Sequence, residues 1–171
     1  ASAEPAQYDD DRAHSLQQFF LDNMPEQGPA KVVHGDYGLH NVLIGADSKI
    51  AAVVDWEIST LGDPLADLAY ALNTWFENDE ERAANPDAAS SVSGFPPKSE
   101  LAQRYADRTG RNLDMLHYYV GFNCWKSACI IHGVYARYMA GQKSTKGVDL
   151  EGLSSRISGL LESSQAAIDR L

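Results

Sequence analysis

The chain has 171 residues, 44% of them hydrophobic and 22% charged, which are ordinary values for one soluble globular domain and too apolar for a disordered chain. Its formal net charge of −10 argues against a nucleic-acid-binding surface, because such a surface needs clustered Lys and Arg. No apolar run approaches the ~20 residues that a membrane span needs, and the first residues do not resemble a signal peptide.

The first third of the chain predicts one helix followed by a small β element. We expect residues 1–11 to be frayed. The apolar residues that then recur at helical spacing are Leu16, Phe19, Phe20 and Met24. Residues 31–33 predict a short strand, and residues 42–44 and 50–54 predict a β-hairpin. Because both hairpin strands are mostly apolar, we expect the hairpin to pack on a helical body.

The rest of the chain predicts helices. Asp63 suits the N-cap of a helix whose first position is Pro64, where no amide donor is needed. Ser99 is expected to cap a further helix that ends at Gly110. Long helices are predicted over residues 113–140 and 150–171.

Residues 77–97 are polar and predict a surface loop excursion. Its acidic cluster, Glu77 to Glu81, is interpreted either as a solvated face or as a lid over a substrate. Cys124 and Cys129 lie five residues apart on one predicted helix and so on different faces. We therefore expect no disulfide between them, and a reducing, cytoplasmic setting fits best.

The residues that suggest chemistry lie between Val33 and Leu72. Asp36 and Asn41 are five residues apart in a loop between two predicted strands, and Asp55 follows at the end of the hairpin. Phosphoryl transfer from ATP needs one carboxylate that orients the acceptor hydroxyl and takes its proton. It also needs oxygen ligands for the Mg²⁺ on the phosphates, which suits Asn41 and Asp55.

Three motifs together make this pattern specific. They are the H-G-D-x₄-N spacing of residues 34–41, the sequence V-D-W-E of residues 54–57, and the run D-W-E-I-S-T-L-G-D-P-L-A-D-L-A of residues 55–69. With them the chain resembles the aminoglycoside phosphotransferase and choline kinase-like family of small-molecule kinases. The third motif is most similar to the branch related to the kinase part of acyl-CoA dehydrogenase fusion proteins, and residues 118–142 are also similar to that branch.

The resemblance implies an α+β, mostly helical fold: the C-terminal lobe of a protein-kinase-like fold, in which a small β-hairpin carries the catalytic loop. It implies that Asp36 is the catalytic base or hydroxyl-positioning group and that Asn41 and Asp55 are the Mg²⁺ ligands, with ATP as co-substrate. Asp67 matches an acid that holds the catalytic loop through its backbone amides. We expect His34 to pack and hydrogen-bond beneath that loop.

Three further residues are weaker candidates. Glu57 occupies the place of the glycine in the D-F-G motif of protein kinases and is within reach of a metal-bound water in this interpretation. Tyr119 and Trp125 either belong to the core of the long helix or line the acceptor pocket. The acceptor classes left open are aminoglycoside-like, choline-like and hydroxyacyl metabolites. The other histidines, His14, His117 and His132, have no metal-ligand spacing and are assigned structural roles.

An ATP phosphotransferase of this class also needs a glycine-rich loop and a strand lysine, and neither precedes Val32. We therefore expect residues 1–171 to form a single C-terminal lobe that lacks its N-terminal nucleotide lobe, has negligible turnover alone and self-associates through the exposed lobe interface. Two other functions stay open. One is a non-catalytic binding or scaffold module with a kinase-derived fold. The other is a metal-dependent hydrolase using His34 and Asp36, which lacks the further ligands of such sites.

Overall fold

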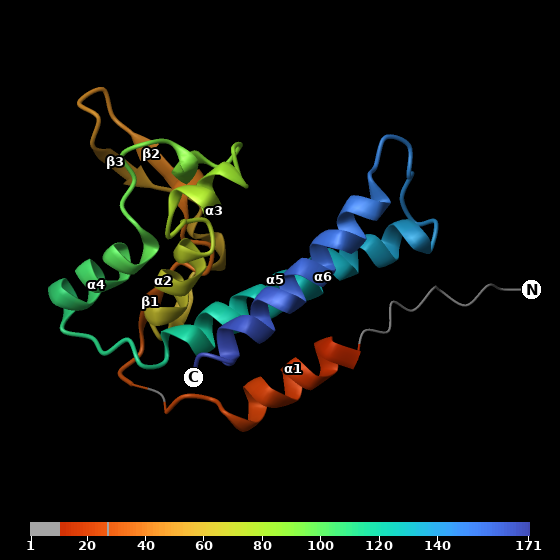
Figure 1. The fold of residues 1–171 in the computed structure, drawn as a ribbon, viewed down its shortest axis with the longest axis horizontal. Helices are drawn as coiled ribbons and strands as arrows, with labels where there is room; N and C mark the ends of the chain where they lie inside the picture. The colour runs from red at the N-terminus through yellow and green to blue at the C-terminus, as the bar shows by residue number, and fades with distance from the viewer. Residues whose placement is uncertain (1–10, 27) are drawn as a thin grey trace, which may run out of the picture. The chain divides into compact units, whose positions relative to one another are not determined.

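The computed structural model describes residues 11–26 and 28–171. The chain divides into two compact units, one made of the residues up to Pro25 together with Gly121–Leu171, the other of Glu26–Val120. Helices dominate both (Figure 1). The expectation of a mostly helical α+β fold is therefore confirmed.

The described part of the Glu26–Val120 unit contains two antiparallel strand pairs. β1 (Lys31–Val33) pairs with β4 (Thr60–Gly62), and β2 (Val42–Ile44) pairs with β3 (Ile50–Val53). The hairpin was predicted from the sequence, whereas β4 was not. The pairing of β1 with β4 brings the chain back beside the start of the loop at residues 34–41, so that the next helix begins next to that loop.

That helix is α2 (Leu65–Leu72), which begins one residue later than predicted, with Pro64 and not Asp63 at the N-cap position. Asp63 nevertheless provides the predicted side-chain acceptor at the start of the helix. The Oδ1 atom of Asp63 accepts a hydrogen bond of 2.9 Å from the amide of Leu65, and the Asp63 carbonyl accepts one from Ala66. Leu65, Leu68, Ala69 and Leu72 are buried, so one face of α2 belongs to the core of this unit.

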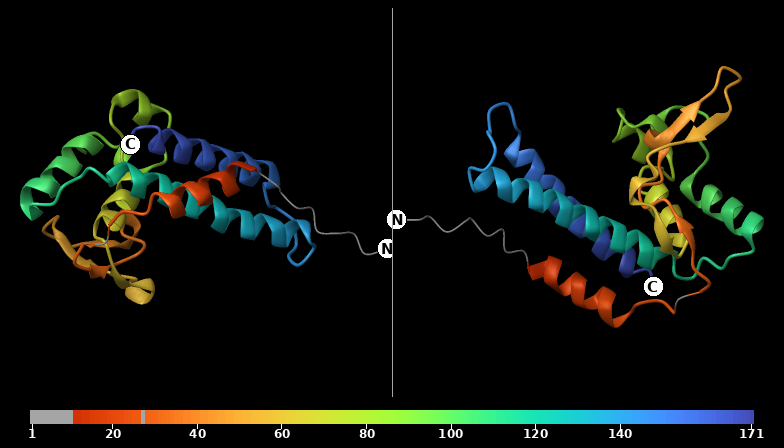
Figure 2. Two further views of the ribbon diagram at one scale, coloured as in Figure 1. Left: turned by 90° about the horizontal axis from the view of Figure 1, so that it is seen from below. Right: turned by 180° about the vertical axis from the view of Figure 1, so that it is seen from behind.

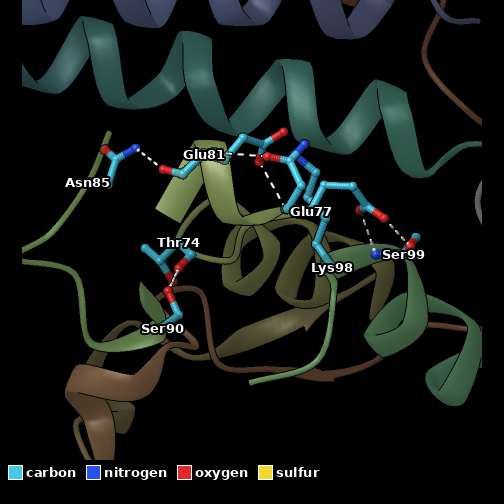
Figure 3. Close-up of polar contacts among 8 residues, drawn as sticks. Thr74, Glu77, Glu81, Asn85, Ser90, Lys98 and Ser99 are labelled. Atoms are coloured by element: carbon cyan, nitrogen blue, oxygen red, sulfur yellow. Dashed lines mark hydrogen bonds and ion pairs between the residues drawn. The ribbon is translucent and has the colours of Figure 1, made fainter. Parts of the chain in front are cut away.

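The excursion at residues 77–97 contains α3 (Asp79–Ala83) and a short 3₁₀ turn (Ala89–Ser91), and it is tied to the start of α4 (Lys98–Thr109) (Figure 3). The prediction that Ser99 caps α4 is wrong, because Ser99 lies within the first turn. Glu77 supplies the acceptors instead: its Oε2 accepts from the Ser99 amide at 3.0 Å, and its Oε1 accepts from the Ser99 hydroxyl. The predicted helix end at Gly110 is confirmed by its left-handed φ of 69°.

Glu81 completes this connection. Its Oε2 atom accepts from the Glu77 amide at 2.9 Å and lies 3.2 Å from the Lys98 ammonium. Two acids of the cluster Glu77 to Glu81 thus connect the excursion to the start of α4 (Figure 3). The Ser90 hydroxyl, which donates to the carbonyl of Thr74, gives a second attachment.

The hairpin differs from its expected packing. Leu43, Ile44 and Ile50 are 52%, 63% and 61% exposed, so the prediction that the hairpin packs on a helical body is wrong for these side chains.

The other unit is a helical bundle of α1 (Asp11–Asp22), the part of α5 (Leu116–Met139) from Gly121 onward, and α6 (Leu150–Ile168) (Figure 2). Phe20 packs against Phe122 with ring centroids 5.6 Å apart. Gly121 allows close approach to α6, because a Cβ there would lie 3.0 Å from Ile168.

Cys124 is buried and Cys129 exposed, both as free thiols, which confirms that they occupy different faces. Among the described residues, no helix has the length and apolar character needed to cross a membrane.

Candidate active site

Asp67 on α2 binds the start of the loop between β1 and β2 through hydrogen bonds. The two carboxylate oxygens of Asp67 accept hydrogen bonds from the backbone amides of His34, at 2.6 Å, and Gly35, at 2.9 Å. Gly35 has a φ of 86°, in the region that favours glycine. This is the contact that the resemblance implies for Asp67, and it fixes the backbone of the two residues directly before Asp36.

His34 lies beneath the loop and is only 1% exposed. Its Nε2 atom is 2.8 Å from the carbonyl oxygen of Val54, and its Nδ1 atom is 3.3 Å from the amide of Asp36. Because a carbonyl only accepts and an amide only donates, Nε2 carries the hydrogen and Nδ1 is the acceptor. Both ring nitrogens are thus occupied within the protein, which removes His34 as a metal ligand and with it the hydrolase hypothesis.

The carboxylate of Asp36 receives three side-chain hydrogen bonds. Its Oδ2 atom is 3.2 Å from Nδ2 of Asn41 and 3.2 Å from Nε2 of His40, and Tyr70 on α2 also donates to the carboxylate. Burial disfavours the charged form, but the hydrogen bonds from Tyr70, His40 and Asn41 and the charge of His40 outweigh it. The pKa of Asp36 is therefore lowered, and the group is ionised at neutral pH.

Asn41 and Asp55 are linked through Val54. The carbonyl oxygen of Asn41 accepts from the Val54 amide at 2.9 Å, and Val54 lies between the end of β3 at Val53 and Asp55. Asn41 is buried, and its Nδ2 donates to both the carbonyl and the carboxylate of Asp36, so that Oδ1 is the atom it can offer to a cation. Asp55 is exposed and has a φ of 66°, a left-handed conformation that costs energy in most residues other than glycine.

These oxygens fit a Mg²⁺ ion that also binds phosphate oxygens, because magnesium needs hard oxygen ligands and only one or two carboxylates from the protein. Within residues 11–26 and 28–171 no cluster of three or more His, Cys, Asp or Glu side chains could hold a metal by itself. A cation held by Asn41 and Asp55 would therefore need further ligands from outside the chain.

The three weaker candidates have the following surroundings. Glu57 is exposed in the 3₁₀ turn Trp56–Ile58. Tyr119 is buried and donates its hydroxyl to Oδ2 of Asp63 at 3.2 Å. Trp125 belongs to the helical bundle, where its indole donates to the carbonyl of Ala13 at 2.9 Å. Tyr119 thus occupies a core position, whereas Trp125 is half-buried.

Sequence reasoning missed two residues of the site, Tyr70 and His40. Both had a usable signal in their spacing. Tyr70 lies three residues after Asp67 and so on the same face of α2. His40 lies four residues after Asp36, in the one-turn 3₁₀ helix Leu39–Asn41.

Comparison with known proteins supports a single assignment. Residues 1–111 match the model of the phosphotransferase enzyme family. The chain is 32% identical over 135 residues to human acyl-CoA dehydrogenase family member 11, covering 77% of this chain and 17% of that protein. It is 31% identical over 134 residues to mouse acyl-CoA dehydrogenase family member 10, covering 76% of this chain and 12% of that protein.

The chain thus spans less than a fifth of the length of these relatives. Among solved structures, it aligns with a thermostable mutant of aminoglycoside phosphotransferase APH(4)-Ia in ternary complex with AMP-PNP and hygromycin B. That alignment has a TM-score of 0.43 and 21% identity over 90% of this chain and 42% of the other. With more than half of its residues inside the matched family model, the chain belongs to the phosphotransferase enzyme family.

Proposed function

We propose that this chain carries the acceptor-activating half of an enzyme that transfers the γ-phosphate of ATP to a hydroxyl group of a small molecule. The observation that carries the proposal is the ionised carboxylate of Asp36, fixed by three donors in the same loop as Asn41. Asn41 in turn is bonded through its backbone to the residue before Asp55.

In the proposed reaction Asp36 accepts a hydrogen bond from the acceptor hydroxyl and directs its oxygen at the γ-phosphorus. The bond from the γ-phosphorus to the bridging oxygen of ADP breaks as the bond to the acceptor oxygen forms, and the hydroxyl proton passes to Asp36. Because the pKa of Asp36 is lowered, we expect it to act mainly by orienting the hydroxyl and to take the proton late in the step.

Asn41 and Asp55 are the residues that would hold Mg²⁺, which on binding neutralises charge on the phosphate oxygens. Asp67 and His34 do not contact substrate in this proposal. They hold the loop so that Asp36 and Asn41 keep their relative positions.

The proposal also requires a glycine-rich loop and a lysine that bind the ATP phosphates, which the sequence of this chain does not contain. The much greater length of the relatives supports a nucleotide-binding lobe outside these residues. We expect the chain alone to have negligible turnover, because half of the positioning groups are then absent.

The test is phosphoryl transfer by the protein in which this chain is joined to its nucleotide-binding lobe, assayed with aminoglycoside, choline-like and hydroxyacyl acceptors. Asp36→Ala should lower kcat by about 10²–10⁴-fold, since this is the usual loss when a positioned base is removed. Asp107→Ala, a change of an exposed acid on α4, serves as the matched control and should leave kcat unchanged.

Transfer by Asp36→Ala within about tenfold of the unmodified enzyme would contradict the assignment. Calorimetry with Mg²⁺ and ATP separates this function from the scaffold alternative. Binding by the protein that carries both lobes supports the enzyme, and binding by neither form supports a non-catalytic module.

A further inference from the structure

We infer that His40 is a positioning residue for the carboxylate of Asp36, and that residue 38 is glycine so that the imidazole of His40 can lie where it does. The inference rests on the proposed function, because the role it assigns is exerted through Asp36. It concerns a pair of residues to which the resemblance gives no role.

His40 and Asn41 both contact the same oxygen of the Asp36 carboxylate. Nε2 of His40 lies 3.2 Å from Oδ2 of Asp36, and Nδ2 of the buried Asn41 lies 3.2 Å from the same oxygen. The His40 side chain is 52% exposed, so the two donors reach the oxygen from different surroundings, Asn41 from the interior and His40 from the solvent side. One carboxylate oxygen is thereby fixed, which limits rotation of the whole group about its Cβ–Cγ bond.

Gly38 provides the space for this contact. A Cβ atom at position 38 would lie 2.6 Å from Cε1 and 2.8 Å from Nδ1 of the His40 ring, closer than carbon atoms and rings approach in proteins. The backbone at Gly38 has φ −161° and ψ 173°, an extended conformation that any residue adopts. The need for glycine here therefore comes from the His40 ring and not from the backbone.

This geometry has a consequence for the reaction. A carboxylate that rotates freely can accept a hydrogen bond from the substrate hydroxyl in many orientations. Only a few of these orientations point the hydroxyl oxygen at the γ-phosphorus. By restraining Asp36, His40 increases the fraction of bound acceptor that is correctly aligned. In this proposal His40 acts through Asp36 on the acceptor hydroxyl, so its contribution belongs in kcat and not in the KM for ATP.

The experiment measures kcat and KM for ATP in the two-lobed protein with four changes: His40→Ala, His40→Gln, Gly38→Ala and the double change Gly38→Ala with His40→Ala. His40→Ala should lower kcat by about tenfold, the effect of losing one hydrogen bond to a charged group, with the KM for ATP unchanged. Gly38→Ala should reproduce this loss, because the added methyl group displaces the ring. His40→Gln should restore most of the kcat, since its amide nitrogen can donate to Asp36.

The double variant is the decisive one. If Gly38 acts only through His40, Gly38→Ala has no further effect once His40 is alanine, and the double variant equals His40→Ala. If the double variant instead loses kcat by the product of the two single losses, the inference is overturned. An unaltered kcat in Gly38→Ala would overturn it as well.

Two results keep this inference separate from the proposed function. An Asp36→Ala enzyme that still transfers phosphate contradicts the function itself. An inactive Asp36→Ala enzyme with fully active His40→Ala and Gly38→Ala variants contradicts the inference alone.

If a variant fails to fold, the inference can still be tested on the unmodified chain by a measurement that does not depend on activity. In the unmodified chain, the Hα protons of Gly38 should show a nuclear Overhauser contact to Hε1 of His40, because the ring lies over that residue. Absence of this contact would also overturn the inference.

Discussion

Two aspartates of the site use the same side chain for different tasks, according to the donors around them. Both oxygens of Asp67 are turned toward backbone amides, whereas Asp36 faces side-chain donors and is 29% exposed. A carboxylate that accepts from backbone amides organises the chain around it. A carboxylate that remains open to solvent can also meet a substrate. The two roles are thus separated by geometry and not by residue type.

At this scale we predict that Asp67→Asn destabilises the chain. An asparagine side chain has only one oxygen, so its NH₂ group would face the amide of His34 or Gly35, donor against donor. The free energy of unfolding should fall by about 1–3 kcal/mol, the usual effect of leaving a partly buried donor without its acceptor. Urea unfolding of the chain measures this, with the exposed Asp107→Asn as control, and equal stability of the two variants would contradict the prediction.

At the scale of elements, Asp63 connects three segments of the Glu26–Val120 unit. It caps α2, accepts from the hydroxyl of Tyr119 in the first turns of α5, and lies 4.0 Å from the guanidinium of Arg111. The cap was predicted from the Asp-Pro pair, but the tyrosine and the arginine were not, because they lie far along the chain. The hydrogen bond from Tyr119 to Asp63 contributes to the stability of this unit only while the Tyr119 hydroxyl remains protonated.

Burial and the neighbouring charge of Asp63 raise the pKa of Tyr119 well above its ordinary value of 10.0. The unfolded chain then loses this proton at lower pH than the folded chain, so the stabilisation is complete below pH 10 and declines as the pH rises above it. We predict that Tyr119→Phe is less stable than the unmodified chain at pH 8 by about 1 kcal/mol, the value of one hydrogen bond.

Toward pH 11 the two unfolding free energies should converge, because phenylalanine does not ionise. Urea unfolding from pH 8 to 11 tests this, with Tyr37→Phe as the control at an exposed ring. A constant difference across that range would show that ionisation of Tyr119 is not linked to folding.

The elements also show what the sequence could reveal. Local patterns located α2 with its Asp63 cap, the end of α4 at Gly110 and the hairpin, because capping, left-handed glycines and alternation act over a few neighbours. β4 was missed, since three residues at 60–62 carry no alternation and form a strand only by pairing with β1. Glu77 as the acceptor at the start of α4 was missed for a related reason, because its partner Ser99 lies twenty-two residues away.

At the scale of the whole molecule, the strands leave much unpaired surface. Each sheet among the described residues has only two strands, so every strand has one free edge, and the hairpin also exposes Leu43, Ile44 and Ile50. Free edges and exposed apolar side chains favour pairing with another chain.

We therefore predict that the chain alone self-associates, with a mass by light scattering that rises above 18.7 kDa as the concentration increases. Replacing Leu43 and Ile44 by Ser and Thr should reduce this association. Ile130→Ser, which removes an exposed apolar side chain on α5 outside the hairpin, should not. A constant monomer mass at high concentration would contradict the prediction.

The two backbone bonds of Val54 bear on how a cation would be held. Its amide is bonded to Asn41 and its carbonyl to His34, so the end of the hairpin and the loop share one attachment point. Because Val54 is bonded to Asn41 and precedes Asp55, a displacement of the end of the hairpin would move Asn41 and Asp55 together. If these two residues hold a cation as proposed, part of the entropy cost of bringing them together is already met by the fold, which would favour binding with only two protein ligands.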